Sequence, residues 1–209
     1  MLFTYAEEKQ TNKEIKVRFF KKGDEIPLFK QGVWQIEKGI VQLETINSLG
    51  ERIVLGWFYP KWVLENIGNF KLPHKAVGLS DISLQWYSGK TINNSPLLAK
   101  KILIQIINQK RQTEALMTIL GTKFVKRRLL QLFVTLRDEI GEKNDIGTVL
   151  KIRLTHQNIG DAINVNRATI SRSFSELIQD GVIKYDKNRR IILLPKFDYF
   201  VSELIDRAK

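Results

Sequence analysis

Two short apolar-periodic runs lie within residues 155–177, THQNIGDAINVNRATISRSFSEL, and a three-residue break separates them. In the first run, Ile159, Ala162 and Ile163 follow an i, i+3, i+4 spacing, which is typical of one face of a helix. The break begins at Asn164, and asparagine tolerates a positive φ better than any residue except glycine. The stretch therefore predicts two crossing helices joined by a tight turn.

The second predicted helix has two distinct faces. Ile170, Phe174 and Leu177 are spaced i, i+4, i+7 and form its buried side. Arg167 lies in the first turn, and the line opposite the buried side consists of Ala168, Arg172, Ser175 and Gln179. An arginine in the major groove can make a bidentate bond to guanine, whereas Ser, Thr and Asn contact phosphates. The exposed face thus has the chemistry of a DNA-reading helix.

A basic hairpin is predicted directly after this helix, in GVIKYDKNRRIILLP. Its two strands flank a polar turn from Asp186 to Arg190, which carries three basic side chains. A two-helix corner also occurs in proteins that bind no DNA, so a non-DNA effector-binding module with the corner as a protein-docking surface is the alternative. The corner, the exposed arginines and the basic hairpin together favour DNA.

Composition narrows the remaining function classes. The chain has no cysteine and only two histidines, His74 and His156, which leaves little for a thiolate metal site, an iron–sulfur cluster or a Ser/His/Asp triad. It also lacks a glycine-rich phosphate loop, so we expect no enzyme. The net charge of +12 suggests a polyanionic partner, although a basic proteome is an alternative cause. Apolar runs are too short to cross a bilayer, and we expect no export or transit peptide.

The N-terminal part is predicted to be rich in β-strands. From Ile15 to about Tyr87, short apolar runs alternate with turn signals at Gly23, Gly39 and Gly50. Short strands at such spacing favour a sandwich or a roll.

The hydrophobic period changes after Ser95. Up to Leu120, residues recur at heptad a and d positions, which we call the seam: Leu103, Ile106, Lys110, Thr113, Met117 and Leu120. Dimerisation through the seam is favoured over a helix that merely packs on its own domain. A further helix is predicted after Gly121 and ends at Gly141, with an apolar face made of Phe124, Leu129, Leu132, Phe133 and Leu136.

The predicted fold class is α+β, with three parts. Residues 1–94 form a β-roll effector-type domain, residues 95–120 a long dimerisation helix, and residues 121–209 a winged helix-turn-helix domain with its helix-turn-helix at about 155–178.

Residues 123–195 resemble the C-terminal winged-helix domain of the cyclic-AMP receptor protein/FNR superfamily. LTHQNIGDAINVNRATISRSFSELIQDGVIKYDKNRRIILL has its Thr-x-Gln start, its Arg-x-Thr-Ile-x-Arg core and its closing hairpin. GVWQIEKGIVQLETINSLGERIVL is similar to the cyclic-nucleotide-binding-like β-roll of that family, and the seam to its dimer helix. QTE at 112–114 and RDEIG at 137–141 resemble its cyanobacterial and plastid nitrogen-regulator (NtcA) branch.

The resemblance implies a set of DNA-binding residues. Arg167 and Arg172 would contact base edges. Thr155, His156, Gln157 and Thr169 would contact or flank phosphates. The other candidate DNA-binding residues are Asn166, Ser171, Ser175 and Lys187. Ala168 stands where the cyclic-AMP receptor branch has a base-accepting glutamate, so that branch's half-site is not expected in full.

The resemblance also bears on effectors. The cyclic-nucleotide branch holds its phosphate with a Gly-Glu and a later arginine, and residues 60–81 have neither, so cyclic AMP is not expected. His74 is expected in a surface loop rather than as a haem ligand. Lys110, Thr113 and Glu114 match the region that faces 2-oxoglutarate in the nitrogen regulators, but Gln109 replaces an expected arginine. Weak 2-oxoglutarate binding and a plain i,i+4 pair of Lys110 with Glu114 are equal alternatives.

The implied partners are double-stranded DNA, a second copy of the chain and RNA polymerase, with no membrane. The implied location is the plastid stroma if the gene is plastid-encoded, and otherwise a bacterial cytoplasm. The chain is therefore expected to be a homodimeric transcription regulator that acts on palindromic sites, with a control function similar to that of the nitrogen regulators.

Overall fold

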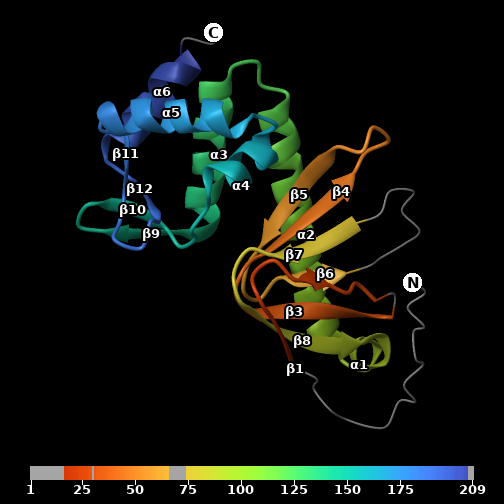
Figure 1. Cartoon of the computed structure of the whole chain (residues 1–209). Coiled ribbons are helices and arrows are strands. Elements are labelled where there is room, and N and C mark those ends of the chain that lie inside the picture. Colours follow the sequence, from red (N-terminus) through yellow and green to blue (C-terminus); the bar gives the residue numbers. More distant parts are fainter. Residues whose placement is uncertain (1–16, 30, 66–73, 207–209) are drawn as a thin grey trace.

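The computed structural model describes residues 17–29, 31–65 and 74–206 (Figure 1). Strands β1 to β8 form the N-terminal part, the long helix α2 follows, and a mixed domain of helices and short strands closes the chain. Within the described residues, no helix combines the length and apolarity needed to cross a bilayer.

Two four-stranded antiparallel sheets make up the N-terminal β-roll. One has the order β1-β8-β3-β6 and the other β2-β7-β4-β5. The strands are β1 (Val17–Phe20), β2 (Glu25–Ile26), β3 (Gly32–Lys38), β4 (Val41–Ile46), β5 (Arg52–Phe58), β6 (Val63–Glu65), β7 (His74–Gly78) and β8 (Ile82–Ser88). This confirms the predicted roll.

Glycines form the turns at the predicted places in the roll. Gly23, Gly39 and Gly50 have φ values of 92°, 90° and 80°, which only glycine adopts without strain. Gly50 lies in the β4–β5 hairpin, whereas Gly39 carries the chain from β3 in one sheet to β4 in the other. The glycine spacing therefore predicted where the strands end, but it did not predict which strands pair.

Helix α2 (Pro96–Leu120) follows the short helix α1 (Gly89–Asn93) and begins at the Ser95 N-cap. One face of α2 is buried against the roll and the helices after it, through Ile102, Gln109, Gln112, Leu116 and Ile119. The seam lies elsewhere on the helix: Leu103 is 56% exposed and Met117 67% exposed. The chain's own core thus uses one face of α2 and leaves three of the six seam residues, Leu103, Lys110 and Met117, exposed.

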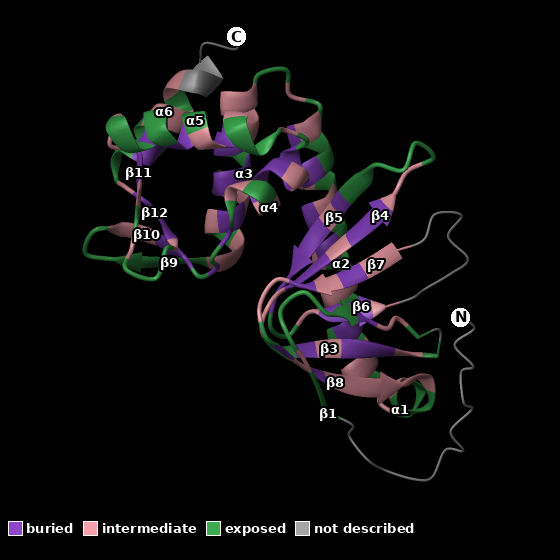
Figure 2. Cartoon of the chain, in the orientation of Figure 1, coloured by how far each residue is buried: buried purple, intermediate pink, exposed green. Residues whose placement is uncertain are grey.

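The C-terminal domain combines four helices with a four-stranded sheet of order β11-β12-β10-β9. Its elements are α3 (Val125–Ile140), β9 (Gly141–Asn144), β10 (Gly147–Leu150), α4 (His156–Ile163), α5 (Arg167–Gln179), β11 (Ile183–Tyr185), β12 (Ile191–Leu193) and α6 (Lys196–Asp206). Buried residues line the space between α3, α4 and α5 (Figure 2), where Phe133 and Phe174 meet edge to face at 5.6 Å. The two-helix corner rests on this core.

Two sequence-based expectations were wrong. Phe124 is not part of the apolar face of α3, because it lies before the helix as its N-cap and is 54% exposed. Its ring is covered by the cationic groups of Lys123 and Arg127, at 5.8 and 5.2 Å. His74 is not a loop residue, because it begins β7 and pairs with Thr45. Residues 60–81, which were expected to lack the cyclic-nucleotide cassette, lie partly outside the described residues.

Candidate nucleic-acid interface

The helix-turn-helix corner is fixed by caps and by one close backbone approach. The Asn158 backbone N–H donates to Thr155 Oγ1 at 3.1 Å, and the Thr155 N–H donates back to Asn158 Oδ1. Asn164 has φ 52°, as the sequence predicted. A Cβ on Gly160 would lie 2.3 Å from the Val165 carbonyl oxygen, so only glycine allows the chain to turn this closely. The caps, the left-handed asparagine and the glycine thus determine the conformation of the two-helix corner.

Helix α5 leaves this corner with the two faces that the sequence predicted. Ile170, Phe174 and Leu177 are almost fully buried. The opposite line, Ala168, Arg172, Ser175 and Gln179, is exposed. Asn166 caps the helix by accepting from the Thr169 N–H at 2.8 Å. Among the described residues, neither Arg167 nor Arg172 forms an ion pair. Both guanidinium groups are therefore available to a ligand.

His156 joins α5 to the hairpin that follows it. Its Nδ1 lies 2.8 Å from Ser171 Oγ, and its Nε2 lies 3.0 Å from the Tyr185 hydroxyl. The Phe174 ring packs against His156 at 4.5 Å and stacks on Tyr185 at 6.0 Å. Burial, and then the positive charge of Arg167, lower the pKa of His156. The neutral ring supplies one donor and one acceptor, so it links helix α5 to the β11–β12 hairpin, which we call the wing.

Several other predicted phosphate contacts also have partners inside the domain. The Gln157 side chain donates to Asp161 Oδ1 at 2.6 Å, and Ser175 Oγ donates to the Ser171 carbonyl at 3.1 Å. Thr155 and Asn166 serve as caps. These polar side chains thus stabilise helices α4 and α5, and Arg167 and Arg172 stand exposed on α5.

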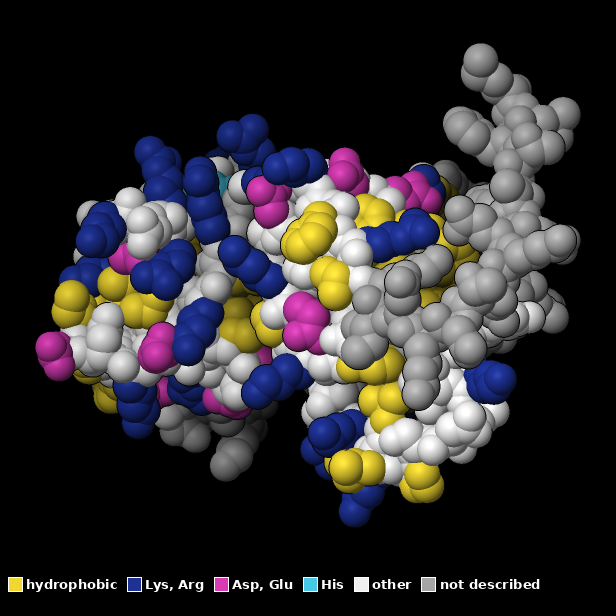
Figure 3. Space-filling view, turned by 90° about the horizontal axis from the view of Figure 1, so that it is seen from below, with side chains coloured by type: hydrophobic (Ala, Val, Ile, Leu, Met, Phe, Trp, Pro, Cys, Tyr) yellow, Lys and Arg dark blue, Asp and Glu magenta, His cyan; other side chains and the backbone are white. Residues whose placement is uncertain are grey.

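The wing turns at an aspartate that the sequence did not single out as a structural residue. Asp186 Oδ1 accepts from the backbone N–H groups of Asn188 and Arg190, both at 2.8 Å. Arg190 Nε donates to Asp186 Oδ2 at 2.7 Å, which removes one of the three basic side chains from the tip. Lys187 and Arg189 remain exposed. Dark blue Lys and Arg side chains are numerous on the winged-helix half of the face in Figure 3.

The DNA-reading domain is in contact with the roll and α2 through polar side chains. Gln112 on α2 accepts from the Trp57 backbone N–H at 2.8 Å and donates to Glu139 Oε2 at 2.6 Å. Burial raises the pKa of Glu139 to about 7, although the Gln112 hydrogen bond acts against this. A single glutamine side chain therefore touches all three parts of the chain. The sequence marked Gln112 only as part of the QTE motif and gave no sign of these contacts.

The residues expected to face an effector are not gathered around one point. Lys110 and Glu114 form the exposed i,i+4 pair that was one of the two alternatives, with 3.6 Å between Nζ and Oε1. Thr113 Oγ1 donates to the Leu55 carbonyl at 3.1 Å. Gln109 is buried and its side chain donates to the Val63 carbonyl. Gln109 thus has a structural role in the packing of α2 on the roll.

Comparison with known proteins agrees with this geometry. Residues 125–198 match the family model of the Crp-like helix-turn-helix domain. The chain is 24% identical over 173 residues to the global nitrogen regulator of Synechococcus elongatus, covering 78% of each chain. It is 30% identical over 76 residues to the putative HTH-type transcriptional regulator ycf28 of Porphyra purpurea, covering 36% of this chain and 32% of that one.

Among solved structures, FixK2 of Bradyrhizobium japonicum superposes with a TM-score of 0.71 at 20% identity, covering 86% of this chain and 92% of that one. This likeness extends the fold over the roll, the long helix and the winged helix. The matched domain supports DNA binding, rather than protein docking, as the role of the two-helix corner. The similar proteins are transcription regulators and not enzymes. The chain therefore carries a Crp-like helix-turn-helix domain, shares its fold with solved regulators such as FixK2, and is a DNA-binding transcription regulator.

Proposed function

We propose that the chain acts as a homodimer that reads a palindromic DNA site with one α5 helix per half-site. The observation that carries this is the exposed seam of α2. Leu103 and Met117 are more than half exposed although the neighbouring face of the same helix is buried. Exposed apolar residues at heptad positions fit a second copy of the same helix.

In this dimer, Arg167 and Arg172 contact base edges. Both lie on the exposed side of α5, and their guanidinium groups match the two acceptors of guanine. Lys187 and Arg189 on the wing contact phosphates, because they lie at the tip of a hairpin beside α5. The two arginines on α5 then read the sequence, and the two basic residues on the wing position the protein on the DNA.

The names of the similar proteins suggest a control function related to nitrogen. One relative is the global nitrogen regulator of Synechococcus elongatus, and another is an HTH-type transcriptional regulator of Porphyra purpurea. We place the protein in the plastid stroma or in a bacterial cytoplasm on this basis. RNA polymerase is the expected protein partner, and weak 2-oxoglutarate binding near Lys110, Thr113 and Glu114 is part of the same proposal.

Selection of bound duplexes from random DNA tests the proposal. The purified protein is mixed with the duplex pool with and without 2-oxoglutarate, and bound DNA is sequenced after several rounds. We expect an inverted repeat with half-site centres about one helical turn, roughly 10 base pairs, apart. Light scattering of the complex should give two chains per duplex. A single unrepeated motif bound by one chain would contradict the dimer, and recovery of no motif would contradict sequence reading.

A further inference from the structure

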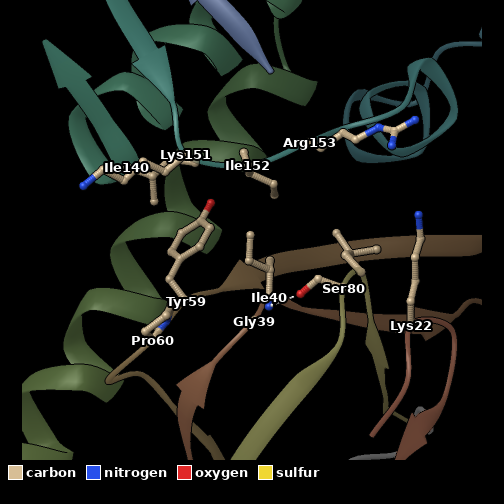
Figure 4. Close-up of a pocket in the computed structure, with 11 residues that line it drawn as sticks. Lys22, Gly39, Ile40, Tyr59, Pro60, Ser80, Ile140, Lys151, Ile152 and Arg153 are labelled. Carbon is tan, nitrogen blue, oxygen red and sulfur yellow. Dashed lines mark hydrogen bonds between the residues drawn. The ribbon is translucent and has the colours of Figure 1, made fainter. Parts of the chain in front are cut away.

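A cavity of about 560 Å³ lies between the β-roll and the winged-helix domain (Figure 4). The roll provides one wall through the loops at the ends of its strands, and the other wall comes from the end of α3 and the segment between β10 and α4. The lining residues are Lys22, Gly39, Ile40, Tyr59, Pro60, Leu79, Ser80, Ile140, Lys151, Ile152 and Arg153. None of the seam or effector residues proposed above belongs to this lining.

The lining combines apolar side chains with basic ones. Ile40 from the roll faces Ile152 from the other domain across the cavity (Figure 4). The basic residues come from both domains, Lys22 from the roll and Lys151 and Arg153 from the winged helix. Among the described residues that line the cavity, none is acidic. This is the pattern of a site for a ligand with an apolar body and a negative group.

The basic groups differ in how far they are already paired. Lys151 Nζ lies 3.1 Å from Glu142 Oε2, so its charge is partly compensated. Lys22 uses its backbone N–H, not its ammonium group, to bond Asp81 at 3.1 Å. Within the described residues, Lys22 Nζ and the Arg153 guanidinium form no ion pair, and both are exposed. These two groups lie on the same side of the cavity (Figure 4).

Tyr59 gives a second, independent sign of a ligand. Its hydroxyl is buried beside the Glu139 and Gln112 side chains but makes no well-formed hydrogen bond to them, and it points between the two walls (Figure 4). Burial, and then the nearby Glu139 carboxylate, raise the pKa of Tyr59, so the hydroxyl keeps its proton. A buried hydroxyl without a partner is costly and rare in folded proteins.

We propose that this cavity binds a small organic anion with a flat apolar body. Its phosphate or carboxylate group is held by Lys22 and Arg153, its body lies between Ile40 and Ile152, and Tyr59 bonds one of its polar atoms. Because the ligand contacts both domains, it fixes the winged helix relative to the roll. The inference rests on neither the dimer nor 2-oxoglutarate, and it is tested without DNA.

Isothermal titration of the full chain with four probes tests the chemistry. The probes are 1-naphthyl phosphate, 1-naphthoate, neutral 1-naphthol and inorganic phosphate. We expect saturable binding of the naphthyl anions, at least about tenfold tighter than naphthol or inorganic phosphate. The tighter of the two anions identifies phosphate or carboxylate as the preferred group. Equal affinity for all four probes, or no saturable binding in the millimolar range, would overturn the proposal.

Variants separate the cavity from general attraction to a basic protein. Arg153→Glu should weaken the naphthyl anion about tenfold or more, and Ile40→Trp should abolish binding by filling the space. Lys100→Glu makes the same charge change on the exposed side of α2 and should leave binding unchanged. Equal losses in Arg153→Glu and Lys100→Glu would refute the site.

Tyr59→Phe tests the hydroxyl. It should weaken the probe with little change in the melting temperature, because the hydroxyl makes no well-formed hydrogen bond to the neighbouring Glu139 and Gln112 in the folded chain. Unchanged binding, or a lower melting temperature, would remove Tyr59 from the proposed site.

Discussion

The Arg52 guanidinium on β5 lies 2.8 Å from the Asp161 carboxylate on α4. The β4–β5 hairpin of the roll therefore touches the first helix of the helix-turn-helix directly. Asp161 also accepts from Gln157, and Arg52 lies 3.8 Å from Glu44, which is 9% exposed. A chain of charged and polar side chains thus runs from the interior of the roll to the surface that reads DNA.

Breaking this pair should have a small effect on stability. The Arg52 side chain is 49% exposed, so we expect Arg52→Ala and Asp161→Ala to be coupled by about 0.5 to 1 kcal/mol in the free energy of unfolding. A double-mutant cycle in urea measures the coupling. A value indistinguishable from zero would show that the two domains are held together by other contacts.

Two basic residues should affect DNA binding differently. Arg172→Ala should cost about 1 to 3 kcal/mol at one guanine position of each half-site, because Arg172 lies on the exposed line of α5. Lys187→Ala should weaken all sequences alike and lower the salt slope by about one, because Lys187 lies on the wing. Titration of matched and mutated duplexes over a range of salt separates them. A uniform loss in both variants would contradict the assignment of α5.

A negative charge introduced into the seam should prevent dimerisation. Met117→Glu places a carboxylate at a heptad position that is 67% exposed in the single chain, so folding should tolerate it while dimerisation and specific DNA binding are lost. Thr118→Glu is the matched control, because Thr118 is exposed one position away from the seam. Sedimentation gives the mass of both variants. A dimeric Met117→Glu that still binds its site would rule the seam out.

The local features of the DNA-reading surface could be predicted from the sequence. Asn164 adopts the left-handed conformation, and Ile170 and Phe174 are buried, because helix periodicity and the conformational range of asparagine are properties of a few adjacent residues. The boundaries of α2 followed in the same way from Ser95 and Gly121. These predictions needed no knowledge of distant contacts.

Contacts between distant residues could not be predicted. His156 reaches Tyr185, 29 residues later, and Trp57 reaches Gln112, 55 residues later. Such pairs depend on how whole elements pack, and one sequence carries no periodic signal for them. The error over Phe124 has a different, local cause. Its spacing fits the apolar face of α3, but the helix begins after it.

Glu139 should make stability depend on pH. Burial raises its pKa from 4.5 to about 7, so the folded chain holds this proton more tightly than the unfolded chain. The resulting stabilisation is fully present below pH 4.5 and is lost as the pH rises through about 7. Glu139→Gln should keep the acceptor for Gln112 and remove the cost of the charge. It should therefore raise the free energy of unfolding at pH 8 by about 1 kcal/mol, a discounted value because the carboxyl is only partly buried.

Urea unfolding at pH 5 and pH 8 measures this difference. Glu139→Gln should flatten the pH dependence without abolishing it, because burial raises the pKa of Glu65 to about 7 as well. Glu37→Gln, on the exposed side of β3, is the control and should follow the unsubstituted chain. Parallel curves for all three proteins would show that Glu139 is charged in the folded state at neutral pH.

The final prediction concerns the effector. We expect no measurable cyclic-AMP binding, and 2-oxoglutarate binding of roughly −4 kcal/mol, equivalent to a dissociation constant of about 1 mM. Lys110 is the nearest basic side chain to the position of the missing arginine, and it is paired only with the exposed Glu114. Lys110→Ala should therefore remove the remaining 2-oxoglutarate binding, whereas Lys100→Ala should not.

Gln109→Arg would restore the arginine that the resemblance leads one to expect, but the Gln109 side chain is buried and donates to the Val63 carbonyl. An arginine there would bring a charge into the contact between α2 and β6, so the melting temperature should fall without a gain in affinity. Calorimetry and thermal unfolding of the variants check both statements, and tight cyclic-AMP binding, or 2-oxoglutarate binding that survives Lys110→Ala, would contradict them.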